Sequence, residues 1–133
     1  MTTEEKLKKY RDWIFRCSAY QMALAVIGID KQTVAPPAGA SYRDERSAYL
    51  AGELFSLETD PEIVSLLGEL KDDPEVGAED KRAIALYYKN AMDSVLIPKE
   101  EFVAFQKLCD ESFDAWIQAK SKADYRIFEP YLK

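Results

Sequence analysis

Apolar residues recur three and four positions apart along most of this chain, and no stretch alternates apolar and polar residues as a half-buried strand would. This periodicity predicts an all-α fold without a sheet. The spacing of helix start and stop signals divides the 133 residues into about five helices of unequal length, which do not form a repeat. We therefore expect residues 1–133 to form a single helical domain, an irregular antiparallel bundle.

The first predicted helix begins at Thr2, which forms a capping box with Glu5, and ends near Gly28, where glycine would suit a C-terminal cap. Its second half carries no charge between Ala19 and Ile29. Apolar residues there occupy nearly all sides of the helix, a pattern typical of a helix enclosed by several neighbours. The sequence therefore predicts that this half of the helix is buried.

Residues 30–40 contain Pro36-Pro37 and Gly39, which predict an extended and irregular connection. Four further helices follow from the start and stop signals. They are expected from Ser41 to about Leu57, from Pro61 to the Asp72-Asp73-Pro74 stop, from near Ala78 to about Val95, and from Pro98 to near Lys120, with a short capped turn after Asp124. The last long helix carries Phe102, Phe105, Phe113 and Trp116, which we expect to lie in the core.

Histidine is absent from the chain, which removes the usual general base near neutral pH and the commonest metal ligand. The 18 basic and 24 acidic residues give a net charge of −6, which disfavours nucleic acid and anionic membranes as partners. Cys17 and Cys109 show no paired spacing and are expected to be free, mostly buried thiols. Acidic residues interrupt the basic start of the chain, so we read no secretion signal and expect a cytoplasmic location.

The compact signatures of nucleotide loops, glycine-flanked serine nucleophiles, zinc sites with paired cysteines and calcium loops are missing from the sequence. Adjacent acidic pairs such as Glu100-Glu101 and Asp110-Glu111 point in different directions on a helix and do not converge. The sequence therefore predicts no catalytic, cofactor-binding or metal-binding residue in this chain.

The segment from Asp30 to Arg46 combines irregular backbone with charge. Arg43 is expected in the first turn of a helix, where the helix dipole disfavours a cation. Either a nearby carboxylate such as Asp30 or Asp44 compensates it, or Arg43 or Arg46 faces a cleft and binds a carboxylate of a substrate. Asp30 itself is expected in a turn, bonded to the backbone two positions on. Tyr42 and Tyr49 should share one helix face, in the core or at an interface.

The pattern Asp30-x-x-Thr33-x-x-Pro36-Pro37-x-Gly39-x-x-x-Arg43 resembles the N-terminal region of the carboxypeptidase Taq family of zinc metallopeptidases. Three later blocks are similar in the same order: Asp60-Pro61-Glu62-Ile63, then Ile97-Pro98, then Trp116-x-x-Ala119 followed by Asp124-Tyr125-x-x-Phe128-x-Pro130-x-Leu132. Ile29 stands where the family usually has tryptophan, and Ala35 stands where a larger residue is usual. The resemblance therefore leaves the choice between carboxypeptidases and oligoendopeptidase-like relatives open.

The resemblance implies a helical fold with zinc at the base of a deep groove, held by an HExxH helix and a later glutamate that this chain does not contain. It implies that the chain is the N-terminal part of a longer zinc metallopeptidase, a wall or lid of the groove. Its partners would be the C-terminal catalytic region of the same protein and a peptide substrate, and a homodimer stays open. Asp30, Thr33, Tyr42, Arg43 and Arg46 are then candidates for lining the groove or for shaping its loop.

Two other functions remain open from the sequence. A free-standing helical interaction module would show the same amphipathic stripes and no enzymatic activity. A catalytic domain in its own right would have to rely on carboxylates alone.

Overall fold

The computed structural model describes residues 1–133 and confirms an all-α fold with five α-helices and no strand. The helices are α1 (Thr3–Thr33), α2 (Ala40–Glu58), α3 (Pro61–Asp72), α4 (Ala78–Ser94) and α5 (Lys99–Lys122). Three short 3₁₀ turns complete the chain: η1 (Pro37–Gly39), η2 (Tyr125–Ile127) and η3 (Glu129–Leu132). None of the helices is both long enough and apolar enough to cross a membrane.

Local capping signals set several helix starts where the sequence predicts them. The Thr2 hydroxyl accepts from the Glu5 backbone N–H at 3.2 Å, and the Glu5 carboxylate accepts from the Thr2 N–H at 2.7 Å. Asp60 caps α3 by accepting from the backbone of Glu62 at 2.8 Å and of Ile63 at 3.4 Å. Each bond satisfies a backbone donor that the first helical turn leaves unpaired, so these starts depend only on nearby residues.

The end of α1 differs from the prediction. Gly28 does not cap the helix but lies inside it, and α1 continues to Thr33. The carbonyl of Asp30 accepts from the N–H groups of Val34 at 3.1 Å and Ala35 at 2.9 Å, and the chain then leaves the helix before Pro36. Proline disfavours helical backbone in the residue before it, so Pro36 is a stronger stop than a tolerated glycine. The irregular connection is therefore shorter than residues 30–40.

The start of α2 also differs from the prediction. Ser41 does not cap it, because η1 leads directly into the helix at Ala40 and Gly39 occupies the N-cap position without a side-chain hydrogen bond. The first turn of α2 therefore lacks the side-chain acceptor that a capping serine would have supplied.

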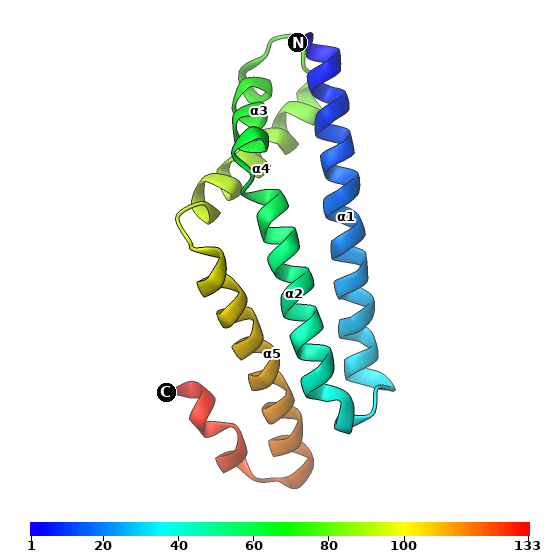
Figure 1. Ribbon diagram of the computed structural model, residues 1–133, viewed down its shortest axis with the longest axis vertical. Coiled ribbons are helices and arrows are strands. Elements are labelled where there is room, and N and C mark those ends of the chain that lie inside the picture. The colour runs from blue at the N-terminus through cyan, green and yellow to red at the C-terminus, as the bar shows by residue number, and fades with distance from the viewer.

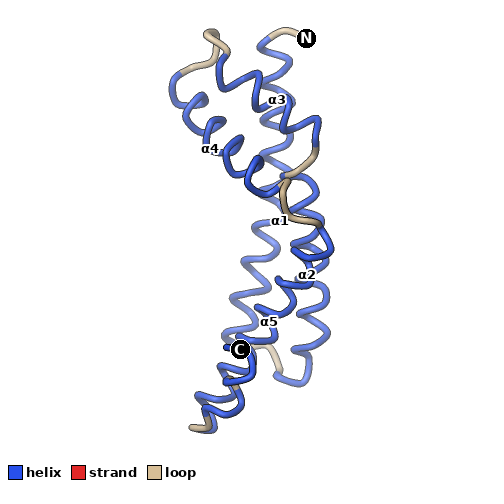
Figure 2. Tube along the Cα trace, turned by 90° about the vertical axis from the view of Figure 1, so that its left-hand side faces the viewer, coloured by secondary structure: helices blue, strands red, loops and turns tan.

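Helix α1 runs along the length of an elongated molecule and joins two groups of helices (Figure 1). Its first half packs against α3, which packs on α4, and its second half packs against α2, which packs on α5. In the view turned by 90°, α3 and α4 lie at one end of the molecule while α2 and α5 lie towards the other (Figure 2). Helices α1 and α2 run antiparallel, as do α2 and α5, so the predicted irregular antiparallel bundle is confirmed.

The main apolar core lies in the group formed by α1, α3 and α4. Leu67, Leu70 and Ile84 are completely buried there. Trp13 joins the same cluster, and its indole N–H donates to the Leu57 carbonyl at 2.9 Å, which ties α1 to the end of α2. Burying a side chain of this size stabilises a fold by about 1.5–3 kcal/mol, so this end of the molecule carries most of the hydrophobic stabilisation.

The group formed by α1, α2 and α5 has a different interior. Its buried apolar side chains are mostly small, and Gly52 lies where α2 meets α5. Phe55 stacks on Phe102 with ring centroids 4.3 Å apart. Small residues let helix backbones approach closely but contribute little apolar area.

The prediction that the second half of α1 is enclosed is wrong. The side chains of Met22, Val26 and Ile29 are 69%, 60% and 64% exposed. The reason is that α2 covers one side of this half, and no other helix of the chain packs against the opposite side.

Several aromatic residues expected in the core are also exposed. Phe105 is 65% exposed and Trp116 is 42% exposed, and Tyr49, expected in the core or at an interface, is 65% exposed and so lies outside the core. Cys17 is buried but Cys109 is exposed, so only one of the two thiols lies in the interior. Helical periodicity identifies apolar faces correctly, but it does not show whether another part of the same chain covers them.

Candidate functional site

The five candidate residues all lie at or near the connection between α1 and α2, but the structure does not bring them to one point. Asp30 is half-buried in the last turn of α1, so its expected position in a turn is wrong. Thr33 is exposed at the end of α1, and its hydroxyl donates to the Ile29 carbonyl at 2.7 Å. Both residues help to end α1 rather than to form a separate loop.

Arg43 folds back onto the connection instead of pairing with a carboxylate. Its Nη2 donates to the Pro36 carbonyl at 3.0 Å, and no ion pair joins it to Asp30 or Asp44, so both expected partners are wrong. A Cβ at residue 39 would lie 2.7 Å from Arg43 Nη1, so Gly39 leaves the room that the guanidinium occupies. Pro36, Gly39 and Arg43 therefore form one structural unit at the start of α2.

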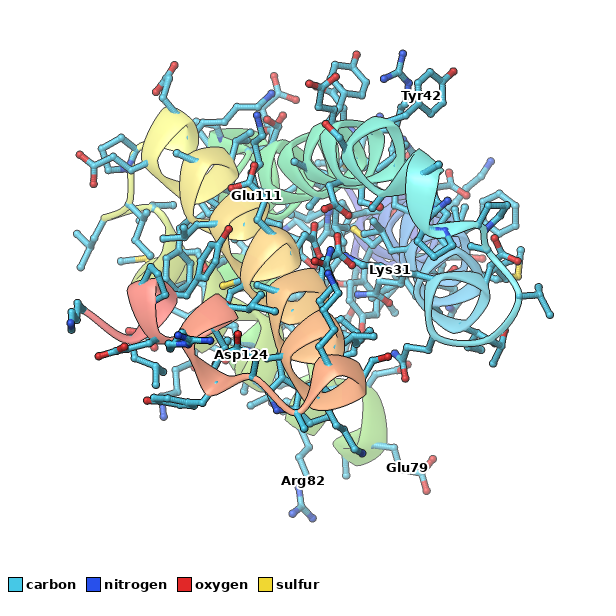
Figure 3. The ribbon with its side chains drawn as sticks, turned by 90° about the horizontal axis from the view of Figure 1, so that it is seen from below. Lys31, Tyr42, Glu79, Arg82, Glu111 and Asp124 are labelled. Atoms are coloured by element: carbon cyan, nitrogen blue, oxygen red, sulfur yellow. The ribbon has the colours of Figure 1, made fainter.

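Tyr42 and Arg46 lie one turn apart on the outer face of α2. The guanidinium carbon of Arg46 lies 3.4 Å from the centroid of the Tyr42 ring, a cation–π contact at an exposed site. Tyr42 is 65% exposed and points away from the bundle (Figure 3). Arg46 also pairs with Glu45 at 3.4 Å, so an aromatic ring, a cation and a carboxylate lie together on this exposed face.

A buried ionic cluster joins α1, α2 and α5. The ammonium group of Lys31 lies 2.8 Å from Asp44 Oδ1 and 3.1 Å from Asp114 Oδ1, and it donates to the backbone carbonyl of Asp110 at 3.1 Å. The Lys31 side chain is only 8% exposed, and it lies between the helices (Figure 3). All three donors of the ammonium group therefore have an acceptor.

Burial and charge shift the pKa values within this cluster. Burial lowers the pKa of Lys31, but hydrogen bonds to Asp44 and Asp114 outweigh this effect and raise it overall. Burial also raises the pKa of Asp114, as does its hydrogen bond with Asp44, while Lys31 opposes the rise. The pKa of Asp110 is raised by burial, and its buried Oδ2 has no hydrogen-bond partner. Three carboxyl groups around one ammonium group leave a surplus of negative charge.

Sequence reasoning missed this cluster. Lys31, Asp44 and Asp114 lie on three different helices, so no local spacing connects them. One signal was present: Asp110 and Asp114 are four residues apart on a helix, where like charges repel unless a cation lies between them. The cluster positions helices, because Lys31 is enclosed by its own partners and is not free to bind a substrate.

The residues of this chain do not fit a zinc ion. No group of three or more histidine, cysteine, aspartate or glutamate side chains is arranged to hold a metal. The ammonium group of Lys31 already occupies the position among the acidic side chains of the buried cluster. Zinc sites in proteins are built from sulfur, imidazole and carboxylate ligands at tetrahedral positions, and this chain does not supply such a set.

The chain matches the family described as Carboxypeptidase Taq (M32) metallopeptidase over residues 9–133. It is similar to Carboxypeptidase 1 of Bacillus subtilis (strain 168), with 32% identity over 129 residues. That match covers 95% of this chain but 25% of the relative, so the chain spans about a quarter of the length of the curated relative.

Two solved structures resemble the fold. "BsuCP Crystal Structure" matches with a TM-score of 0.92 and 29% identity, covering 96% of this chain and 26% of that one. "The Structure of CHT" matches with a TM-score of 0.71 and 30% identity over the same shares of the two chains. The resemblance extends over almost the whole sequence and is confirmed by the family match, so this chain belongs to the carboxypeptidase Taq (M32) family of metallopeptidases.

Proposed function

We propose that residues 1–133 form the N-terminal helical domain of a longer zinc metallopeptidase of the carboxypeptidase type, and that this domain is a wall or lid of the peptide groove. One observation carries the proposal: nearly all of this chain matches the family, yet it corresponds to about a quarter of a relative and offers no metal-binding group. The zinc site and the catalytic residues would then belong to the remaining three quarters.

The large exposed surface area of the chain supports the proposal that another part of the protein covers one of its faces. A compact monomer of 15.2 kDa exposes about 7,100 Å² according to the scaling of surface with mass, whereas this chain exposes 9153 Å². The surplus arises because α2 and α5 cover only one side of the second half of α1, and many apolar side chains face outward. Exposed apolar area of this extent is typical of a surface that meets another part of a protein.

The outer face of α1 is the surface that we assign to the catalytic region. Phe15, Met22, Val26 and Ile29 are all at least 60% exposed. At 100° per residue they fall within an arc of about 60° on the helix, so they form one apolar stripe. We call these four residues the α1 stripe. Contact between the α1 stripe and the catalytic region would remove this area from water.

The connection between α1 and α2 is the part that we assign to the groove. Arg43 is bonded to the Pro36 carbonyl in the room that Gly39 leaves, while Tyr42 and Arg46 lie exposed on α2, where Arg46 also pairs with Glu45 at 3.4 Å. Asp30 and Thr33 form hydrogen bonds that end α1 beside this connection. A peptide offers carbonyl groups, a carboxylate and side chains, and this combination of donors and apolar surface suits it.

The proposal is tested by comparing this chain with a form extended through the downstream coding sequence. The extended protein should co-purify with zinc and hydrolyse a peptide from its C-terminus, and a chelator should abolish that activity. The 133-residue chain should do neither. If the extended protein neither binds zinc nor hydrolyses the peptide, the result would favour the alternative of a free-standing interaction module. Hydrolysis by the 133-residue chain in the presence of a chelator would indicate a carboxylate-only enzyme. The homodimer and the cytoplasmic location stay predictions.

A further inference from the structure

A pocket of about 460 Å³ lies between the start of α2 and the last turns of α5. Its charged lining residues are Lys31, Arg43, Lys122 and Asp114. Lys31 and Asp114 pair with each other at 3.1 Å, which leaves Arg43 and Lys122 as cations without a carboxylate partner. Exposed or unpaired cations at one side of a pocket are notable in a chain whose net charge is −6, so the placement of Arg43 and Lys122 calls for a specific explanation.

The guanidinium group of Arg43 is held in place but keeps unused donors. The guanidinium group makes a single hydrogen bond within the chain, from Nη2 to the Pro36 carbonyl at 3.0 Å. Its Nε is buried and has no hydrogen-bond partner. A guanidinium group has five N–H donors and no acceptor. Because the hydrogen bond to the Pro36 carbonyl already orients the guanidinium group, a ligand at this group would have to order the side chain less.

The opposite wall of the pocket adds further polar groups. Gln118, Ser121 and Lys122 reach it from α5, and Ala40 reaches it from the first turn of α2. That turn has no side-chain cap, and the Ala40 N–H donates to the Pro37 carbonyl, so the helix start offers its partial positive charge rather than the Ala40 donor. Pro37 and Ile117 supply apolar surface beside these groups. Cations, hydroxyl and amide groups together with a helix start are the features that recognise an oxyanion.

We propose that this pocket binds a carboxylate group of a peptide, with Arg43 and Lys122 as its charged contacts. Lys31 holds Asp114 together with Asp44 inside the buried cluster, so Arg43 and Lys122 are the unpaired charges that a ligand in the pocket would meet. The choice of a peptide as the source of the carboxylate rests on the proposed peptidase function. The carboxylate is either the free C-terminus of the peptide or an acidic side chain.

Acetate is the first probe, added to the isotope-labelled protein at constant ionic strength. The Arg43 Nε–H resonance and the backbone amides of Ala40, Ser41 and Lys122 should shift and saturate. The substitution Arg43→Gln should weaken binding by about tenfold or more, as expected for the loss of one charge-assisted contact. Lys122→Gln should weaken it by about threefold, because an exposed lysine contributes less.

Lys120→Gln is the matched control. Lys120 is also exposed near the end of α5, but it lies 5.2 Å from the centroid of the Trp116 ring and does not line the pocket. The Lys120→Gln substitution should leave the acetate affinity unchanged. If Arg43→Gln fails to fold, the Lys122 and Lys120 variants still decide the question. Shifts that do not saturate, or equal affinities for these two variants, would overturn the proposal.

Three blocked peptides then separate the two sources of the carboxylate. N-acetyl-trialanine carries a free C-terminus, its amide carries no carboxylate, and N-acetyl-Ala-Glu-Ala-amide carries only an acidic side chain. Binding of the first alone assigns the C-terminus, and binding of the third alone assigns an acidic side chain. Tight binding of the uncharged amide would contradict the proposal. If carboxylates bind saturably but the extended protein is inactive, the carboxylate site is supported and the peptidase function is rejected. Failure of the site and failure of the peptidase function can therefore be told apart.

Discussion

Lys31 and Asp44 form an ion pair of 2.8 Å across the interface between α1 and α2, and their side chains are only 8% and 4% exposed. The same ammonium group reaches Asp114 at 3.1 Å, so one side chain connects three helices. This group of helices has mostly small apolar residues in its interior, so the orientation of α1, α2 and α5 depends on the buried ion pairs as well as on hydrophobic packing.

Replacement of Lys31 by methionine should destabilise the chain. It would leave Asp44 buried without a cation, which costs about 3–5 kcal/mol when one partner of a buried pair is removed. The measurement is the free energy of unfolding from urea denaturation. Lys107→Met is the matched control, because Lys107 pairs with Glu111 at 3.9 Å on the surface and should change the free energy by about 0.5 kcal/mol or less. Equal effects of the two substitutions would contradict this account.

Asp114 should make the stability of the chain depend on pH. Burial raises the pKa of this carboxyl above its ordinary value of 3.8, so the folded chain binds the proton more tightly than the unfolded chain. Its contribution to stability is then fully present below pH 3.8 and is lost as the pH rises through the raised pKa. Asp114→Asn cannot titrate, and its free energy of unfolding should fall less between about pH 4 and 7. Identical pH slopes for both proteins, measured by urea denaturation, would rule this out.

Two glycines in helices should respond to alanine in opposite directions. A Cβ at Gly28 would meet nothing within 4 Å, so Gly28→Ala should stabilise the chain by about 0.5–1 kcal/mol through its helix propensity. A Cβ at Gly52 would lie 2.7 Å from Val103 Cγ2, so Gly52→Ala should cost about 1–3 kcal/mol by overpacking. Thermal unfolding of the two variants measures the signs, and shifts in the same direction would be inconsistent with the structure.

The two thiols should differ sharply in reactivity. Burial raises the pKa of Cys17 to about 11, with the charge of Glu58 as a second cause, whereas Cys109 is exposed. Because the thiolate is the reactive form, Cys17 should react slowly at pH 8. Iodoacetamide should modify one cysteine quickly in the native protein, peptide mapping should identify it as Cys109, and Cys17 should react only after unfolding. Rapid modification of both thiols in the native protein would show that Cys17 is accessible.

The starts of α1 and α3 could be predicted from the sequence because they depend on residues close together in the chain. Thr2 with Glu5, and Asp60 with Pro61, supply the cap and the fixed backbone within a few positions. The end of α1 was predicted less well, because Gly28 is tolerated inside a helix and the decisive stop lies at Pro36. Glycine lowers helix propensity without preventing the helix, whereas proline restricts the residue before it.

The candidate site could be predicted only in part. The Pro36, Gly39 and Arg43 pattern does mark a structural unit, but the contact that explains it, from Arg43 to a backbone carbonyl, cannot be read from spacing. Lys31 was missed because its partners lie on helices that meet only in the folded chain. The exposure of Met22 and Val26 was missed for a related reason, since an apolar face predicts a contact without naming its partner.

Reconstitution tests whether the α1 stripe contacts the catalytic region and supports its activity. The 133-residue chain and the separately produced catalytic region are mixed, and peptide hydrolysis is measured with and without the Met22→Glu and Val26→Glu substitutions in the α1 stripe. We expect the wild-type chain to bind the catalytic region and increase hydrolysis, and the two glutamates to abolish both effects because buried charges without partners are unfavourable. Full hydrolysis by the catalytic region alone, unchanged by adding this chain, would contradict the account.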